Sequence, residues 1–206
     1  MTRTECLAVA GAHFDEGRFL ADLQRRVALR TESDRGQVPP DLDQYLRGEM
    51  QQTLSALGFA CQVHSNPVAS GGPLLVARRV EDPDLPTVLT YGHGDVVSGQ
   101  ESQWREGLQP WNVTIEGDKW YGRGTADNKG QHTVNLLGLA SAIHARQGRL
   151  GYNVTVLLET GEEAGSPGLR EFCQRQPELL KAVLLIASDG PRLHASDLRH
   201  RNAEPA

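Results

Sequence analysis

Two continuous apolar runs, residues 153–158 and 182–187, constrain the fold of this chain most strongly. They are short and partly β-branched, which is typical of strands that are covered on both faces. A short helical pattern lies between them at 168–174, and a longer one with an apolar face precedes them at 128–144. Strands that alternate with helices predict an α/β domain of three layers, with a mostly parallel sheet between helices.

The rest of the chain extends this pattern. Residues 14–29 have a helical apolar face, and a second helix is expected after Pro39-Pro40, ending at Gly58. Further strand-like runs lie at 60–64, 74–80, 87–91 and 113–116. We expect residues 1–192 to belong to one domain and residues 193–206, which have little apolar periodicity, to form a disordered tail.

Composition excludes several classes of protein. The net charge of −5, without a run of Lys or Arg, gives no general affinity for nucleic acid. No 18-residue apolar stretch is present, so no membrane partner is expected, and the first residues do not resemble a signal peptide. The three cysteines form no CxxC pair, which favours a reducing compartment over a disulfide framework. We therefore expect a cytoplasmic protein.

Polar clusters follow the apolar runs or glycine-rich turns at four places. They are His93-Gly94-Asp95, Asp127-Asn128, Glu162-Glu163 and Asp189. In open α/β sheets, ligands bind beyond the carboxyl ends of the strands, so these clusters are expected at one edge. Five carboxylates so close together would repel each other unless cations were bound. One imidazole among carboxylates suits zinc, cobalt or manganese better than calcium, and the number of carboxylates favours two metal ions over one.

Each cluster also has a purely structural interpretation. His93 and Asp95 could hold each other in a turn, and Asp127 could cap the helix that follows it. Glu162 and Glu163 could be a solvated acidic pair, and Asp189-Gly190-Pro191 is a common turn sequence.

A nucleotide site is a further alternative, because Gly122-Arg-Gly124-Thr-Ala-Asp127 half matches the GxGxxG pattern. However, Asp127 replaces the third glycine, and its charge would meet a pyrophosphate at the start of the helix. This difference argues against a dinucleotide.

Four motifs together resemble a known family. GHGDVV, WYGRGTADNKG, ETGEEAGSPG and ASDGPRL are similar to those of the co-catalytic zinc metallopeptidases, which include carnosinase-type dipeptidases, aminoacylase, carboxypeptidase G and succinyl-diaminopimelate desuccinylase. The resemblance covers residues 10–192 in order. It implies a metal-dependent hydrolase that cleaves the amide bond of a small peptide or an N-acyl amino acid and uses two zinc ions, with cobalt or manganese as alternatives.

The resemblance also implies roles for individual residues. His93 and Asp189 would bind the first metal, Asp127 would bridge the two metals, and Glu163 would bind the second. Of the two catalytic residues, Asp95 would orient the imidazole of His93. Glu162 would be the general base that takes a proton from a metal-bridging water. The family also places the peptide bond between Asp127 and Asn128 in the cis form.

The sequence departs from the family after residue 192. Members continue into a lid domain and then return to the catalytic domain, where a last histidine binds the second metal. The 206 residues contain no counterpart of these parts, so the resemblance implies a truncated member with impaired turnover. The alternative is a non-catalytic metal-binding remnant or an interaction module. An uncovered sheet edge would then favour self-association.

Overall fold

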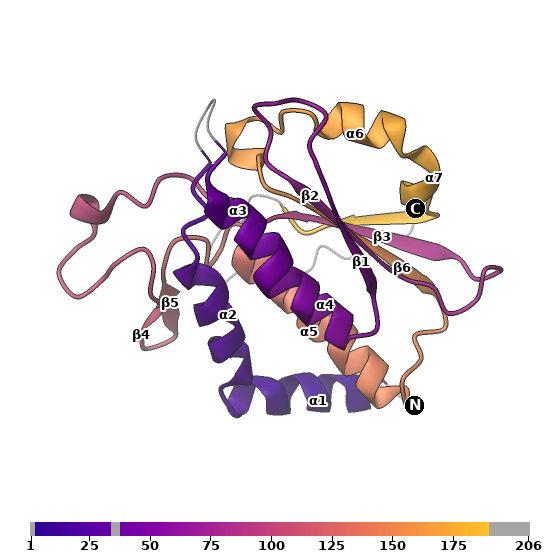
Figure 1. Ribbon diagram of the computed structural model, residues 1–206. Coiled ribbons are helices and arrows are strands. Elements are labelled where there is room, and N and C mark those ends of the chain that lie inside the picture. Colours follow the sequence, from indigo (N-terminus) through magenta and orange to yellow (C-terminus); the bar gives the residue numbers. More distant parts are fainter. Residues whose placement is uncertain (1–2, 34–37, 190–206) are drawn as a thin grey trace, which may run out of the picture.

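The computed structural model describes residues 3–33 and 38–189 (Figure 1). Its helices are α1 (Arg3–Asp15), α2 (Arg18–Ala28), α3 (Pro40–Gln44), the π-helical η1 (Tyr45–Met50), α4 (Gln51–Ala56), the 3₁₀ turns η2 (Glu101–Gln103) and η3 (Glu162–Ala164), α5 (Lys129–Ala145), α6 (Leu169–Arg175) and α7 (Pro177–Leu180). Its strands are β1 (Ala60–His64), β2 (Leu74–Arg79), β3 (Thr87–His93), β4 (Thr114–Glu116), β5 (Lys119–Tyr121), β6 (Asn153–Glu159) and β7 (Leu184–Ala187).

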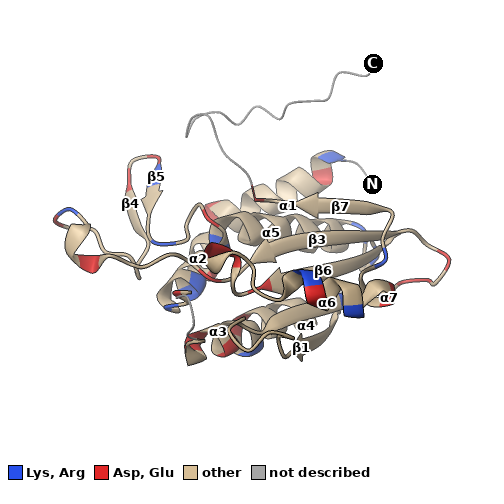
Figure 2. Cartoon of the chain, turned by 90° about the horizontal axis from the view of Figure 1, so that it is seen from above, with Lys and Arg blue, Asp and Glu red and all other residues tan. Residues whose placement is uncertain are grey.

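Five of these strands form one sheet in the order β1-β2-β6-β3-β7. β3 is parallel to both β6 and β7, whereas β2 is antiparallel to β6 and to β1. Only β2 therefore runs against the other described strands of this sheet. Figure 2 shows β6, β3 and β7 side by side, with acidic residues at the ends of these strands.

Helices cover the two faces of the sheet. On one face, α4, η1 and α5 pack on the sheet around a buried cluster that includes Tyr45, Leu54, Leu136 and Leu158. On the other face, Phe172 of α6 packs against Leu74, Val76 and Leu157, with residues of α7 at the margin. The predicted α/β class and the three layers are thus confirmed. The β4–β5 hairpin extends to one side of these layers (Figure 1).

The N-terminal region differs from the sequence-based prediction. The helix expected over 14–29 begins at Arg18, as α2, because Gly17 adopts a left-handed conformation with φ of 75° at its start; α1, over 3–15, was not predicted. Glycine reaches this conformation without the steric cost that a side chain adds. The apolar face of α2, formed by Phe19, Leu23 and Val27, packs with Val113, as its periodicity predicts.

The apolar runs 153–158 and 182–187 were both predicted to be strands covered on both faces, and this prediction holds for the first run only. All residues of β6 are buried, because β6 lies between β2 and β3. β7 is instead the last described strand at one edge of the sheet, and its residues are exposed. Val183, Leu184, Leu185 and Ile186 are between 44% and 76% exposed.

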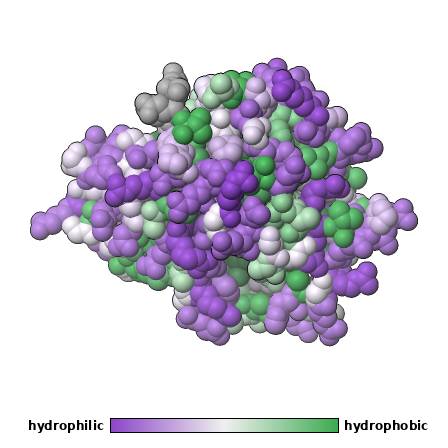
Figure 3. All heavy atoms as spheres, viewed as in Figure 1, coloured by the Kyte–Doolittle hydropathy of each residue, from purple (hydrophilic) through white to green (hydrophobic). Residues whose placement is uncertain are grey.

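The face of the molecule seen in Figure 3 is mostly polar. On the face shown in Figure 3, hydrophobic residues form small, separate areas in a largely hydrophilic surface. Among the described helices, none has the length and apolar character needed to cross a membrane. The tail expected over 193–206 lies outside the described residues.

Candidate metal centre

His93 is the last residue of β3 and lies at the centre of the site. β6 and β7 flank β3, so that His93 is in register with Glu159 of β6. The imidazole is fully buried. Its Nδ1 lies 3.1 Å from the backbone carbonyl oxygen of Asp95 and 3.3 Å from Oδ1 of the same residue. These contacts turn the ring so that Nε2 faces the carboxylates of the other clusters.

Asp95 links this imidazole to the turn after β6. Its fully buried carboxylate accepts hydrogen bonds from the backbone N–H groups of Glu162, at 3.2 Å, and Glu163, at 3.1 Å. Asp95 thus contacts the ring of His93, and its expected orienting role stays a prediction. In addition, Asp95 fixes the position of both glutamates through their main chain.

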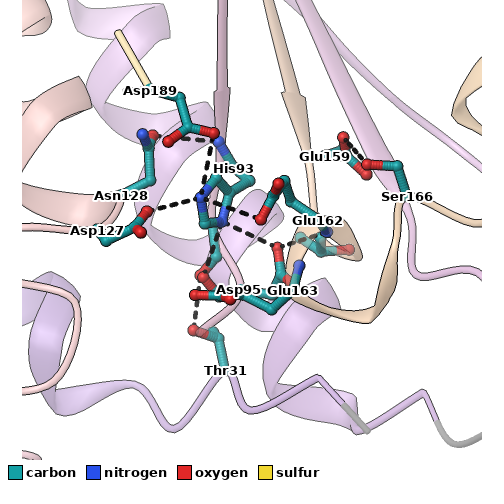
Figure 4. Close-up of polar contacts among 12 residues, drawn as sticks. Thr31, His93, Asp95, Asp127, Asn128, Glu159, Glu162, Glu163, Ser166 and Asp189 are labelled. Atoms are coloured by element: carbon teal, nitrogen blue, oxygen red, sulfur yellow. Dashed lines mark hydrogen bonds and ion pairs between the residues drawn. The ribbon is translucent and has the colours of Figure 1, made fainter. Parts of the chain in front are cut away.

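Three carboxylates lie around Nε2 of His93 (Figure 4). Oδ1 of Asp127 is 3.0 Å from this nitrogen, Oε2 of Glu162 is 3.8 Å away and Oδ2 of Asp189 is 3.9 Å away. One ligand atom from each of His93, Glu162 and Asp189 falls within a group no more than 4.8 Å across. Segments that are far apart in the sequence thus meet at one point, as the clusters predict.

The ionisable groups of the site shift one another's pKa values. Burial lowers the pKa of His93, but Asp95, and then Asp127 and Glu162, outweigh this effect and raise it to about 9. Burial raises the pKa of Glu162; His93 opposes that shift, and the carboxylates of Asp189, Asp95 and Asp127 add to it. The pKa of Glu163 is raised as well, by burial and then by Asp127. Like charges held together in this way favour a bound cation.

The donor set fits a divalent transition metal. It consists of an imidazole nitrogen and carboxylate oxygens, which are ligands that zinc, cobalt and manganese accept. The other ring nitrogen, Nδ1, contacts Asp95, as is usual for a histidine that binds metal. The side chains of Glu162 and Asp189 are 36% and 27% exposed, so the group is open to solvent on one side. A small substrate could approach from there.

The expected site residues differ in how close they lie to the group around His93. The compact group includes Glu162, for which the resemblance implies a role in proton transfer, in addition to the expected ligands His93 and Asp189. Asp127 contacts His93, although its side chain is 61% exposed, and its peptide bond to Asn128 is cis, as the resemblance implies. Among the described residues, Glu163 is not part of the compact group. Its main-chain N–H donates a hydrogen bond to Asp95 of the site at 3.1 Å.

One acidic residue of the site region was missed in the sequence. Glu159, at the end of β6, is 3% exposed, and its Oε1 accepts hydrogen bonds from Tyr91, at 2.5 Å, and Ser166, at 2.9 Å. Its backbone carbonyl accepts the N–H of Gly94. Glu159 thus ties the turn 160–166 to β3. Its place in the motif ETGEEAGSPG, at the end of an apolar run, was the available signal.

Sequence comparison agrees with the geometry of the site. Residues 89–200 match the sequence model of peptidase family M20/M25/M40. A β-Ala-His dipeptidase of Mus musculus is 34% identical over 178 residues, which are 81% of this chain and 35% of that protein. A cysteinylglycine-S-conjugate dipeptidase of Corynebacterium striatum is 30% identical over 139 residues, which are 66% of this chain and 29% of that protein.

Solved structures give the same result. Human carnosine dipeptidase 1 superposes with a TM-score of 0.78 and 27% identity, covering 91% of this chain and 41% of that one. The M20 metallo-carboxypeptidase Sso-CP2 of Sulfolobus solfataricus has a TM-score of 0.71, also at 27% identity, and covers 82% of this chain and 37% of that one. The chain spans about a third of the length of the curated relatives that it matches. It belongs to peptidase family M20/M25/M40.

Proposed function

We propose that this chain carries the metal-binding part of a hydrolase that cleaves the amide bond of a small peptide or an N-acyl amino acid. The observation that carries the proposal is the group formed by His93, Glu162 and Asp189, with Asp127 beside it. The dipeptidases among its relatives support a dipeptide as the substrate. In this proposal, residues 1–192 are the N-terminal part of the catalytic domain.

His93, Asp127 and Asp189 would hold the first metal ion, and Asp127 and Glu163 would contribute to a second. A zinc ion held by these residues would lower the pKa of a coordinated water to about 7, far below that of free water. The supporting geometry is that carboxylate oxygens of Asp127 and Asp189 face the same nitrogen of His93.

Glu162 is proposed as the general base. Its carboxylate lies next to His93 and is partly open to solvent, so it can reach a water molecule at the site. Burial is the first cause that raises the pKa of Glu162. A pKa closer to neutral pH makes the carboxylate a better proton acceptor and, later, the carboxylic acid a better donor. Glu162 would take the proton from the attacking water and pass it to the leaving nitrogen.

The test has two parts. Metal content per chain, measured after dialysis against trace zinc, is expected to be at least one ion and to fall in His93→Ala. Hydrolysis of β-alanyl-histidine, other dipeptides and N-acetyl amino acids is then compared between the wild type and Glu162→Gln. General base catalysis typically contributes 10²- to 10⁴-fold, so we expect a loss of about that size. Glu178→Gln, on the exposed side of α7, is the matched control.

The two results separate the candidate functions. Turnover that survives Glu162→Gln would contradict the role of Glu162. A folded chain that binds metal but cleaves none of the substrates would favour the second candidate, a non-catalytic interaction module. The observation in favour of that candidate is the exposed apolar strand β7 at the sheet edge, which could pair with a second copy of this chain.

The cellular location of the chain is also a proposal. Cys6, Cys61 and Cys173 are all free thiols, which supports a reducing compartment such as the cytoplasm.

A further inference from the structure

The side chain of Asn128 joins two strand ends at the metal centre. It is fully buried, and its Oδ1 accepts the backbone N–H of His93 at 3.2 Å. Its Nδ2 donates to the backbone carbonyl of Ser188 at 2.8 Å. One partner is a hydrogen-bond donor and the other is an acceptor. These two partners therefore determine which side-chain atom of Asn128 is Oδ1 and which is Nδ2. Asn128 therefore holds the end of β3, which carries His93, next to the residue that precedes Asp189.

A second contact to Asn128 determines the state of a buried histidine. Nδ1 of His132 lies 3.3 Å from Oδ1 of Asn128, and Nε2 of the same ring lies 2.5 Å from the hydroxyl of Tyr45. Oδ1 can only accept hydrogen bonds, so Nδ1 must carry the proton. In a neutral ring Nε2 is then an acceptor, and the hydroxyl of Tyr45 donates to it.

The surroundings favour these protonation states. His132 and Tyr45 are 4% and 0% exposed. Burial keeps the pKa of His132 well below its usual value, and the positive charge of Arg26 adds to this effect, so the ring is neutral. Burial raises the pKa of Tyr45, so the phenol keeps its proton. The hydrogen bonds therefore run in one direction, from Tyr45 through His132 to Asn128.

We propose that Tyr45, His132 and Asn128 are positioning residues for the metal centre. The hydroxyl of Tyr45 selects the tautomer of His132 that donates to Asn128. The amide of Asn128, held in this way, keeps the main chain at His93 and Ser188 in place, so that the imidazole and the carboxylate of Asp189 face the same point. This inference rests on the proposed metal-binding function. None of the three residues would bind metal or substrate.

The space around Asn128 supports a fixed position. A Cβ atom added at Gly92 would lie 2.8 Å from Oδ1 of Asn128, which is too close for carbon and oxygen atoms that are not bonded. The amide is thus packed directly against the main chain of β3. If Nε2 of His132 carried the proton instead, the lone pair of Nδ1 would face Oδ1, and repulsion would displace the amide.

Tyr45→Phe is the substitution that tests this chain of hydrogen bonds. It removes one oxygen from a core residue and leaves the ring in place. Zinc affinity, measured by competition with a chromophoric chelator, is expected to fall about 10-fold, the lower end of the effect seen for residues that support metal ligands. Tyr152→Phe, at the margin of the same core cluster, is the matched control and should bind zinc as the wild type does.

Two measurements, the tautomer of His132 and the zinc affinity, decide whether the proposal holds. ¹⁵N chemical shifts of the wild-type histidine rings should show Nδ1 of His132 protonated and Nε2 unprotonated, and the opposite tautomer would overturn the proposal even if Tyr45→Phe failed to fold. Equal zinc affinity in the wild type and in folded Tyr45→Phe would also overturn it. Absence of zinc binding by the wild type would instead contradict the proposed metal centre itself.

Discussion

The carboxylate of Asp95 lies 3.3 Å from Nδ1 of His93, and both side chains are fully buried. The same carboxylate accepts the main-chain N–H groups of Glu162 and Glu163. The orientation of the imidazole and the position of the turn that carries two acidic site residues therefore depend on one side chain. A change at Asp95 should affect both.

Asp95→Asn tests this double role. Asparagine has one acceptor oxygen, so its NH₂ group would face the N–H of Glu163 in one orientation, and the N–H of Glu162 and the ring of His93 in the other. Zinc affinity is expected to fall by about 10- to 100-fold, as for other residues that support metal ligands. Isothermal titration with zinc measures this change, and Asp118→Asn, in the exposed turn between β4 and β5, is the control. An unchanged affinity would show that Asp95 does not position the site.

Glu81 is expected to stabilise the fold at neutral pH. Its carboxylate accepts the N–H groups of Leu150, at 2.6 Å, and Gly151, at 2.8 Å, and pairs with Arg79 at 3.3 Å. Burial alone would raise the pKa of Glu81, but these hydrogen bonds and the ion pair outweigh it and lower the pKa. Glu81→Gln should therefore reduce the free energy of unfolding at pH 7 by about 1–3 kcal/mol.

The pH dependence has a definite sign. Because the pKa of Glu81 is lower in the folded state, its contribution is fully present above the unfolded value of about 4.3 and is lost as the pH falls through the folded value. The difference in urea stability between the wild type and Glu81→Gln should shrink over this range. A difference that stays constant down to pH 2 would rule out this explanation.

The edge strand β7 offers a test of self-association. Ile186 in β7 and Ile115 in β4 are both 44% exposed isoleucines in strands, so they form a matched pair. If β7 pairs with a second copy, Ile186→Lys should raise the dissociation constant of the dimer by 10-fold or more, and Ile115→Lys should leave it unchanged. Sedimentation velocity over a concentration series measures both. A wild-type chain that stays monomeric at every concentration would exclude this pairing.

Much of the fold could be predicted because hydrophobic periodicity is local. The helix over 128–144 and the strand over 153–158 each differ from the observed bounds by one residue at one or both ends. The exposure of β7 could not be predicted in this way. An apolar run indicates that a strand is suited to burial, whereas its place in the sheet depends on which other strands pair with it.

The residue types of the site could be predicted from the sequence, whereas the hydrogen bonds that join them to distant residues could not. Apolar runs or glycine-rich turns followed by His93, Asp127, Glu162 and Asp189 indicate a metal site, and the structure brings these side chains together. The buried contact between Tyr45 and His132 joins residues 87 positions apart, and no local pattern signals it. His132 lies outside the four polar clusters, and the structure shows it in the core next to the site.

The order of strands in the sheet has a consequence for synthesis on the ribosome. Both neighbours of β3 in the sheet, β6 and β7, follow it in the sequence, and β6 begins 60 residues after β3 ends, at 153 against 93. At roughly 5–20 residues per second, β3 would wait about 3–12 s for its first partner strand. During this interval its edges would be open to other nascent chains, so chaperone binding near the ribosome should matter most for this segment.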